Sequence, residues 1–175
     1  MNVLFHTTAA IGIVAMLTDT RTKPHTATQM FLPGMLVFLA GIASHGALDY
    51  IPHCYPINSK VDAIVGLIVM ITLTMISKNT YRPIVALAFL GSIFPDLIDL
   101  SIPIINKYLV VNLPKTQKLF PWHWEEYSGS IYITDCRIST VNHFILLVTV
   151  TAICYCRKTD IKNIITCTNE KSAAV

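Results

Sequence analysis

The stretch FLPGMLVFLAGIASHGALDY, residues 31–50, combines a long apolar run with a histidine and an aspartate near its end. About 20 predominantly apolar residues in a helix are enough to cross a hydrocarbon core. His45 and Asp49 are four residues apart, so a helix would place both side chains on one face. Ionisable side chains inside a membrane helix are costly and tend to mark function. The stretch therefore predicts a membrane fold and indicates where its chemistry lies.

The whole chain has the composition of a membrane protein. It has 175 residues, of which 53% are hydrophobic and 13% are charged, and its mean hydropathy is +0.57. A soluble domain carries about 25% charged residues. No Gly/Ser linker divides the chain, so we expect a single membrane domain over residues 1–175, an all-α polytopic bundle of about five transmembrane helices. The predicted spans are about 2–18, 30–50, 62–77, 83–102 and 138–156, with one long loop at 103–137.

Three further expectations concern the first span, the fourth span and the orientation in the membrane. The first apolar stretch lacks a basic n-region and a small-residue cleavage site, which favours a retained helix over a signal peptide. Pro95 is expected to kink or break the fourth helix just before Asp96. With five spans, eight Lys and Arg fall on the side of the C-terminus and five on the other side. This imbalance predicts a cytoplasmic C-terminus and an outside N-terminus.

Charge and cysteine usage exclude some classes of function. The net charge of +3 is small and scattered, so no nucleic-acid partner is expected. The five cysteines form no CxxC pair, which argues against a zinc ribbon or a thioredoxin-like motif. Cys54 and Cys136 can pair if their loops face the same oxidising compartment; otherwise they stay free thiols.

The long loop contains PWHWEEY at residues 121–127. Two Trp and one Tyr suit the headgroup region, so this segment can be an interfacial anchor. Alternatively it is a lid over a site, with His123, Glu125 or Glu126 touching substrate or metal. The sequence leaves both interpretations open.

Unusual ionisable residues collect at one level of the predicted bundle. Spans 1 and 5 begin on the same side on which spans 2 and 4 end, and each of these ends carries a His or an Asp. Singly, each residue has an ordinary explanation, such as a hydrogen-bonding histidine or a solvated aspartate at a helix end. Together they indicate a shared site between helices that Gly34, Gly41, Gly46 and Gly91 allow to approach closely. The predicted metal ligands are His6, His45, Asp49, Asp96, Asp99 and His143.

Such a mixed set of nitrogen and oxygen ligands favours a divalent transition metal. We expect Zn²⁺, as one or two ions, with Mn²⁺ or Fe²⁺ as alternatives. A metal of this kind lowers the pKa of a bound water and polarises a carbonyl or phosphoryl oxygen.

The motifs SHGALDYIPH (residues 44–53) and FPDLID (residues 94–99), with an N-terminal FHT, resemble a family of bacterial inner-membrane proteins. This family, the YdjM-like group, is described as predicted metal-dependent hydrolases. Its motifs would correspond here to His6, to Ser44-His45 with Asp49, to Pro95-Asp96 with Asp99, and to Asn142-His143. The resemblance implies a bacterial inner (cytoplasmic) membrane, an embedded metal site and a hydrolase akin to zinc-dependent phospholipases C.

The sequence therefore predicts a membrane-embedded metal-dependent hydrolase that acts on a membrane-proximal ester, such as a phospholipid or other lipid phosphate. Membrane lipid would be both its surroundings and the source of a lipid-like substrate. The predicted catalytic residues are Asp49, Asp96 and His53. A carboxylate that binds no metal can act as general base, and His6 or His53 would complete the metal shell. Two alternatives stay open: an ion- or proton-coupled transporter, and a non-catalytic membrane protein whose helices are stapled by a metal.

Overall fold

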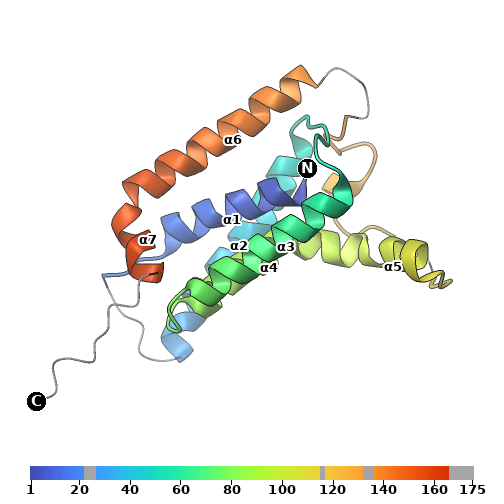
Figure 1. The fold of residues 1–175 in the computed structure, drawn as a ribbon. Coiled ribbons are helices and arrows are strands. Elements are labelled where there is room, and N and C mark those ends of the chain that lie inside the picture. The colour runs from blue at the N-terminus through green and yellow to red at the C-terminus, as the bar shows by residue number, and fades with distance from the viewer. Residues whose placement is uncertain (22–26, 115–116, 132–135, 166–175) are drawn as a thin grey trace, which may run out of the picture.

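The computed structural model describes residues 1–21, 27–114, 117–131 and 136–165. These residues form seven α-helices and one 3-10 turn, in the order shown in Figure 1. The elements are α1 (Val3–Leu17), α2 (Ala27–Tyr50), α3 (Ser59–Ile76), α4 (Arg82–Asp99), α5 (Ser101–Leu109), η1 (Pro121–His123), α6 (Arg137–Cys156) and α7 (Lys158–Ile165).

Helix α1 lies in the middle of the bundle. It packs against α2, α3 and α4 on one side and against α6 on the other (Figure 1). Its small residues allow this, since Ala10 and Ala15 are almost completely buried. A carboxylate holds its first turn, because Asp62 of α3 accepts hydrogen bonds from the backbone N–H groups of Val3 and Leu4. Asp62 therefore caps α1, and it also lies in the first turn of α3, where the helix dipole favours a carboxylate.

Three helices are long and apolar enough to cross a membrane: α2 over Gln29–Tyr50, α3 and α6. The pair α4 and α5 would make a fourth span if its bend of 64° is counted as one broken span. Helix α1 is apolar but has only 15 residues. The helical bundle is thus confirmed, and all five predicted spans are helical, whereas a count of five membrane crossings stays a prediction.

Of the two outcomes expected at Pro95, a kink or a break, the break does not occur. Helix α4 continues through Pro95 to Asp99, and the chain turns by 64° from α4 into α5. The ring of Pro95 is fully buried, so packing against the neighbouring helices holds α4 together across the missing N–H. The predicted loop 103–137 is also shorter than expected, because its beginning belongs to α5 and its end to α6.

The closest contact between helices is the crossing of α2 and α4. A Cβ atom built on Gly91 would lie 2.2 Å from the carbonyl oxygen of Phe38, and one on Gly41 would lie 2.8 Å from the carbonyl carbon of Gly91. The two backbones therefore touch, as expected from the glycines. Gly46 differs, because it faces the indole of Trp122, the middle residue of η1.

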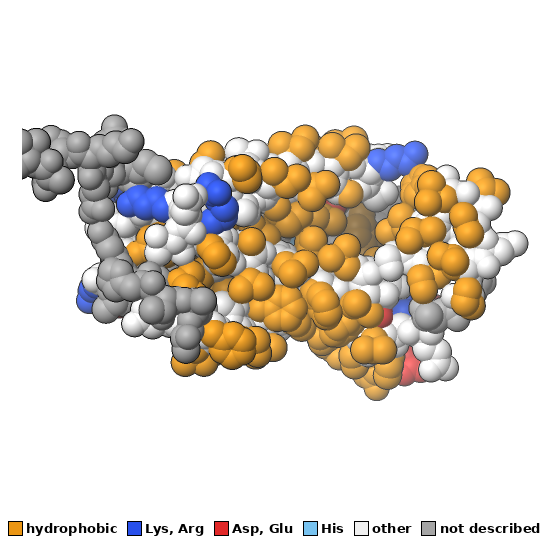
Figure 2. All heavy atoms as spheres, turned by 90° about the horizontal axis from the view of Figure 1, so that it is seen from below, with side chains coloured by type: hydrophobic (Ala, Val, Ile, Leu, Met, Phe, Trp, Pro, Cys, Tyr) orange, Lys and Arg blue, Asp and Glu red, His pale blue; other side chains and the backbone are white. Residues whose placement is uncertain are grey.

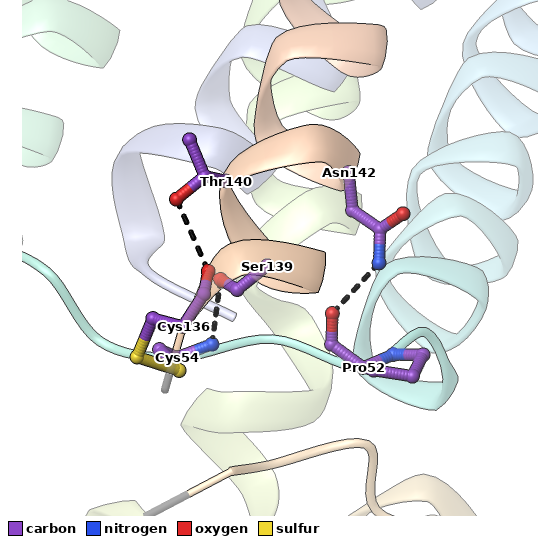
Figure 3. The surroundings of a disulfide bond; sticks show 6 residues. All are labelled: Pro52, Cys54, Cys136, Ser139, Thr140 and Asn142. Carbon is purple, nitrogen blue, oxygen red and sulfur yellow. Dashed lines mark hydrogen bonds between the residues drawn. A yellow bond between two sulfur atoms is a disulfide. The ribbon is translucent and has the colours of Figure 1, made fainter. Parts of the chain in front are cut away.

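A disulfide joins Cys54, in the loop after α2, to Cys136 at the start of α6 (Figure 3). Two hydrogen bonds reinforce this link: the Cys54 N–H donates to the Ser139 hydroxyl at 2.7 Å, and the Asn142 side chain donates to the Pro52 carbonyl at 2.8 Å (Figure 3). Of the two outcomes that the sequence left open for these cysteines, the structure has the bonded one.

We predict that Gly91→Ala lowers the free energy of unfolding by roughly 2–3 kcal/mol, because the new methyl group meets backbone that cannot move aside. Gly12→Ala is the matched control, since its methyl group would meet only the Val150 side chain at 3.2 Å. Both changes raise helix propensity equally. Thermal unfolding of the two variants in detergent measures the difference. Equal stability of the variants would show that the α2–α4 crossing is looser than described.

Candidate metal centre

Four side chains from three elements converge at one end of the bundle. His45 and Asp49 come from the last turns of α2, Asp96 comes from the end of α4, and His123 comes from η1. One nitrogen or oxygen of each lies within 4.8 Å of the corresponding atom of every other. Three of the four residues are buried, and the Asp96 side chain is 24% exposed. Among the described residues, this is the group that could hold a metal ion.

The separations within this group match a metal site. His45 Nε2 lies 3.2 Å from His123 Nε2, 3.2 Å from Asp49 Oδ2 and 3.6 Å from Asp96 Oδ1. His123 Nε2 lies 3.4 Å and 3.3 Å from the same two carboxylate oxygens. Ligands about 2.0–2.1 Å from a tetrahedral Zn²⁺ would be about 3.3–3.4 Å from one another. The five separations that involve a histidine therefore match the spacing of ligands around one ion, and the two carboxylate oxygens lie within 4.8 Å of each other.

Hydrogen bonds leave the Nε2 atom of both histidines available to an ion. His45 Nδ1 lies 2.6 Å from the Ser92 carbonyl oxygen, so this nitrogen carries the hydrogen and donates it. His123 Nδ1 lies 2.8 Å from Asp99 Oδ2 and likewise donates. A ring that donates from Nδ1 directs the lone pair of its neutral Nε2 outward, which is the arrangement of metal-bound histidine.

Asp99, a predicted ligand, therefore stands behind His123 and outside the four-residue group. Its two carboxylate oxygens also accept backbone N–H bonds from Leu119 (2.7 Å) and Phe120 (3.0 Å). Asp99 thus fixes both the ring of His123 and the segment that carries it. Such carboxylate partners orient a ligand and raise its basicity.

His6, another predicted ligand, lies at the edge of the group. Its Nε2 is 3.2 Å from Asp49 Oδ1, and its ring stacks on His45 with centroids 3.9 Å apart. Both ring nitrogens are buried, and apart from this contact neither has a hydrogen-bond partner within the described part of the chain. Buried polar atoms almost always have a partner. A cation at Asp49 could be that partner for Nε2, so His6 fits the shell of the same ion or of a second one.

The other predicted residues lie elsewhere. His143 stacks on Phe5 with centroids 3.8 Å apart, and α6, which carries it, packs on α1 rather than on α2 or α4. His53 donates from Nδ1 to the Ile51 carbonyl at 2.8 Å, and its Nε2 lies 3.1 Å from the Tyr55 hydroxyl and 3.2 Å from the Ser130 hydroxyl. Burial lowers the pKa of His53 to about 4, so its ring is neutral and accepts. The structure brings neither histidine into the four-residue group.

The segment that carries His123 is clamped onto the end of α2. The Gly129 N–H donates to the Asp49 carbonyl at 2.7 Å, and the His53 N–H donates to the Gly129 carbonyl at 2.8 Å. The Lys118 ammonium donates to the His123 carbonyl at 2.6 Å. Of the two interpretations of PWHWEEY, these contacts support a lid whose histidine belongs to the site.

The charge of the group is balanced by positive neighbours. The amino group of Met1 ion-pairs with Asp49. Burial disfavours the charged form of His123, but its hydrogen bonds to Asp49, Asp96 and Asp99 outweigh burial and raise its pKa to about 10. The ion-free protein therefore holds a proton where an ion would bind, and a metal would displace it.

Three of the four residues, Asp49, Asp96 and His123, also line a cavity of about 830 Å³. Its other walls come from α3, α4, α5 and the segment after η1. The face drawn in Figure 2 is mostly hydrophobic and is hollowed between its apolar side chains. The candidate centre is thus buried among helices yet approachable from one side.

Comparison of the chain with protein-family models, curated proteins and solved structures finds no match in any of the three.

We predict that the purified protein binds Zn²⁺ or Co²⁺ at one or two ions per chain, and that Asp49→Asn and His123→Ala abolish this binding. Asp99→Asn should weaken binding about 10–100-fold, because it removes only the partner that orients His123. Metal content and the visible absorption of bound Co²⁺, which is intense only for tetrahedral ligation, measure these effects. Glu126→Gln, on the same segment but exposed, is the control. Normal metal content in His123→Ala would remove this residue from the shell.

A second prediction concerns pH. Because the folded pKa of His123 is raised above the ordinary value of about 6.5, its contribution to stability is full below that pH and is lost as pH rises through about 10. The ion-free protein should therefore lose stability between pH 7 and pH 10, while its apparent affinity for Zn²⁺ rises. Thermal unfolding with and without a chelator measures both trends. His123→Gln should flatten the first trend; an unchanged slope would contradict the assignment.

Proposed function

We propose that the protein is a metal-dependent hydrolase that acts on a membrane-proximal ester, with Zn²⁺ as the best-fitting ion and Mn²⁺ or Fe²⁺ as alternatives. The observation that carries this proposal is the group His45, Asp49, Asp96 and His123, whose atoms stand at ligand spacing beside a cavity. A metal ion bound there supplies a more acidic water and polarises the oxygen of a substrate.

The accessibility of the group favours catalysis over a purely structural role. Structural zinc sites are closed, whereas catalytic ones keep a position for water or substrate. Three of the four ligand residues line the cavity here, so a substrate oxygen can reach the ion from that side. In this proposal Asp96, the least buried of the four, takes the proton of the attacking water through its second carboxylate oxygen.

His53 enters the same proposal as a positioning residue. His53 itself does not line the cavity, but Tyr55 and Ser130 do. The hydroxyls of these two residues lie within hydrogen-bonding distance of the His53 Nε2 atom. The neutral ring orients these hydroxyls toward the substrate.

The proposal extends to the place of the protein in the cell. The disulfide lies at the end of the bundle that holds the candidate centre, and disulfides persist in oxidising compartments. This supports a centre on the non-cytoplasmic side, with the C-terminus cytoplasmic, as the distribution of Lys and Arg predicts. A bacterial inner membrane and membership of the YdjM-like hydrolases rest on the motif resemblance alone.

We predict that the protein in mixed micelles releases product from a chromogenic phosphodiester or a phospholipid only with metal bound. A chelator should abolish turnover, and Zn²⁺ or Mn²⁺ should restore it. Asp96→Asn should lower kcat by at least about 100-fold, since it removes a ligand and the proposed base. The rate of product release against metal concentration is the measurement.

Glu126→Gln serves again as the control, because it changes an exposed carboxylate on the segment that carries His123. Stoichiometric metal without turnover of phosphate or carboxylate esters would refute the hydrolase and leave a metal that staples the helices. Metal-independent turnover would refute the role of the candidate centre.

A further inference from the structure

We propose that the cavity between α3 and the α4–α5 bend binds an acyl chain of an anionic membrane lipid and presents the ester of that lipid to the candidate metal centre. Hydrolysis of the ester rests on the proposed hydrolase activity. The binding of the chain rests on the shape and polarity of the cavity.

The cavity is divided into a polar end and an apolar end. The polar lining includes the ionisable residues Asp49, Asp62, Asp96, His123, Glu125 and Lys118, and the hydroxyl residues Tyr55 and Ser130. Toward the interior the walls are hydrocarbon. They are formed by Ala63, Leu67, Met70, Ile93, Leu97 and Ile104. A ligand that fills this space therefore needs a polar group joined to an extended apolar part.

The lining along α3 extends over about the depth of one leaflet. It begins at the polar residues Ser59 and Asp62 and continues through Ala63 and Leu67 to Met70. At 1.5 Å per residue Ser59 and Met70 are about 16 Å apart along the helix. Half of a hydrocarbon core about 30 Å thick is a similar distance. The volume of about 830 Å³ also lies within the range of ligand pockets, about 300–1,000 Å³.

The cavity opens on the apolar side of the bundle. Leu67, Leu97 and Ile104 line it although their side chains are 52%, 46% and 51% exposed. Leu67 belongs to a helix long and apolar enough to cross a membrane, and the other two to the bent pair. The opening therefore faces hydrocarbon, and a chain can pass from the bilayer into the cavity without crossing water. A water-soluble ester would leave these walls without an apolar partner.

An anionic headgroup has two positive partners at this end, a bound metal ion and Lys118. The carboxylates of Asp62 and Glu125 also line the cavity, and the Asp62 carboxylate is engaged by the backbone N–H groups of Val3 and Leu4. A divalent ion would neutralise Asp49 and Asp96, which are both part of the ligand group. Lys118 lines the same end, and its ammonium uses one N–H for the His123 carbonyl, which fixes the charge beside the centre. With metal bound, the ion and this lysine can receive a phosphate, as Lys and metal ions commonly do in phosphate sites.

The test is photo-crosslinking of the full chain in lipid nanodiscs. The probe is phosphatidic acid with a diazirine midway along one acyl chain, and a diacylglycerol with the same chain is the neutral comparison. We expect cross-links on the cavity-lining residues Leu67, Met70 and Leu97, and about tenfold fewer in Leu67→Trp, which fills the cavity. The acidic probe should cross-link more than the neutral one, and Lys118→Gln should remove that preference.

The matched control is Ile68→Trp, because Ile68 is 57% exposed on the same helix but does not line the cavity. Leu97→Trp and Ile98→Trp form a second pair on α4 if Leu67→Trp proves unstable. The Asp49→Asn variant should lose the metal but still be cross-linked by the probe. This variant therefore distinguishes a failure of hydrolysis from a failure of lipid binding. Cross-links spread equally over Ile64, Leu67 and Ile68 in the unaltered protein would overturn the proposal.

Discussion

The contact between the backbones of α2 and α4 at Gly41 and Gly91 is the constraint on which the candidate centre depends. His45 lies one turn beyond Gly41, and the Ser92 carbonyl that accepts from its ring directly follows Gly91. A hydrogen bond of 2.6 Å from a side chain of one helix to the backbone of another requires that the two helices nearly touch there. The same proximity brings Asp49 and Asp96 within reach of one ion.

Burial of two carboxylates so close together has an electrostatic consequence. Asp49 is 6% exposed, and an uncompensated buried charge is strongly destabilising. In the ion-free protein the compensation comes from the Met1 amino group and from the proton on His123, which explains why the pKa of His123 is raised to about 10. A divalent cation could replace these positive charges, and it could also be a partner for the Nε2 atom of His6, which faces Asp49.

Much of this arrangement could be predicted from the sequence, because hydropathy and helical spacing are local signals. They located the helices and the pairing of His45 with Asp49, and they placed Asp96 at the same end. The fourth member, His123, lies in the connection between α5 and α6, where no helical periodicity predicts the direction of a side chain. The aromatic residues around it were the one signal that distinguished this segment of the connection. Spacing likewise could not separate Asp96 from Asp99. The first reaches the group, while the second is drawn to two backbone N–H groups and the far side of His123.

Contacts between loops hold His123 beside the other three residues of the group. Three of the four ligand residues stand on α2 and α4, but the fourth is held by contacts that run from Asp49 through Gly129 to His53 and then to the disulfide at Cys54. The disulfide is not part of the α2–α4 crossing. Breaking it would loosen the loop after α2, whose His53 N–H donates to the Gly129 carbonyl. His123 is also held by α4, because Asp99 accepts hydrogen bonds from its ring and from the N–H groups of Leu119 and Phe120. Its segment is therefore fixed from two sides, and only the support through the disulfide depends on an oxidising compartment.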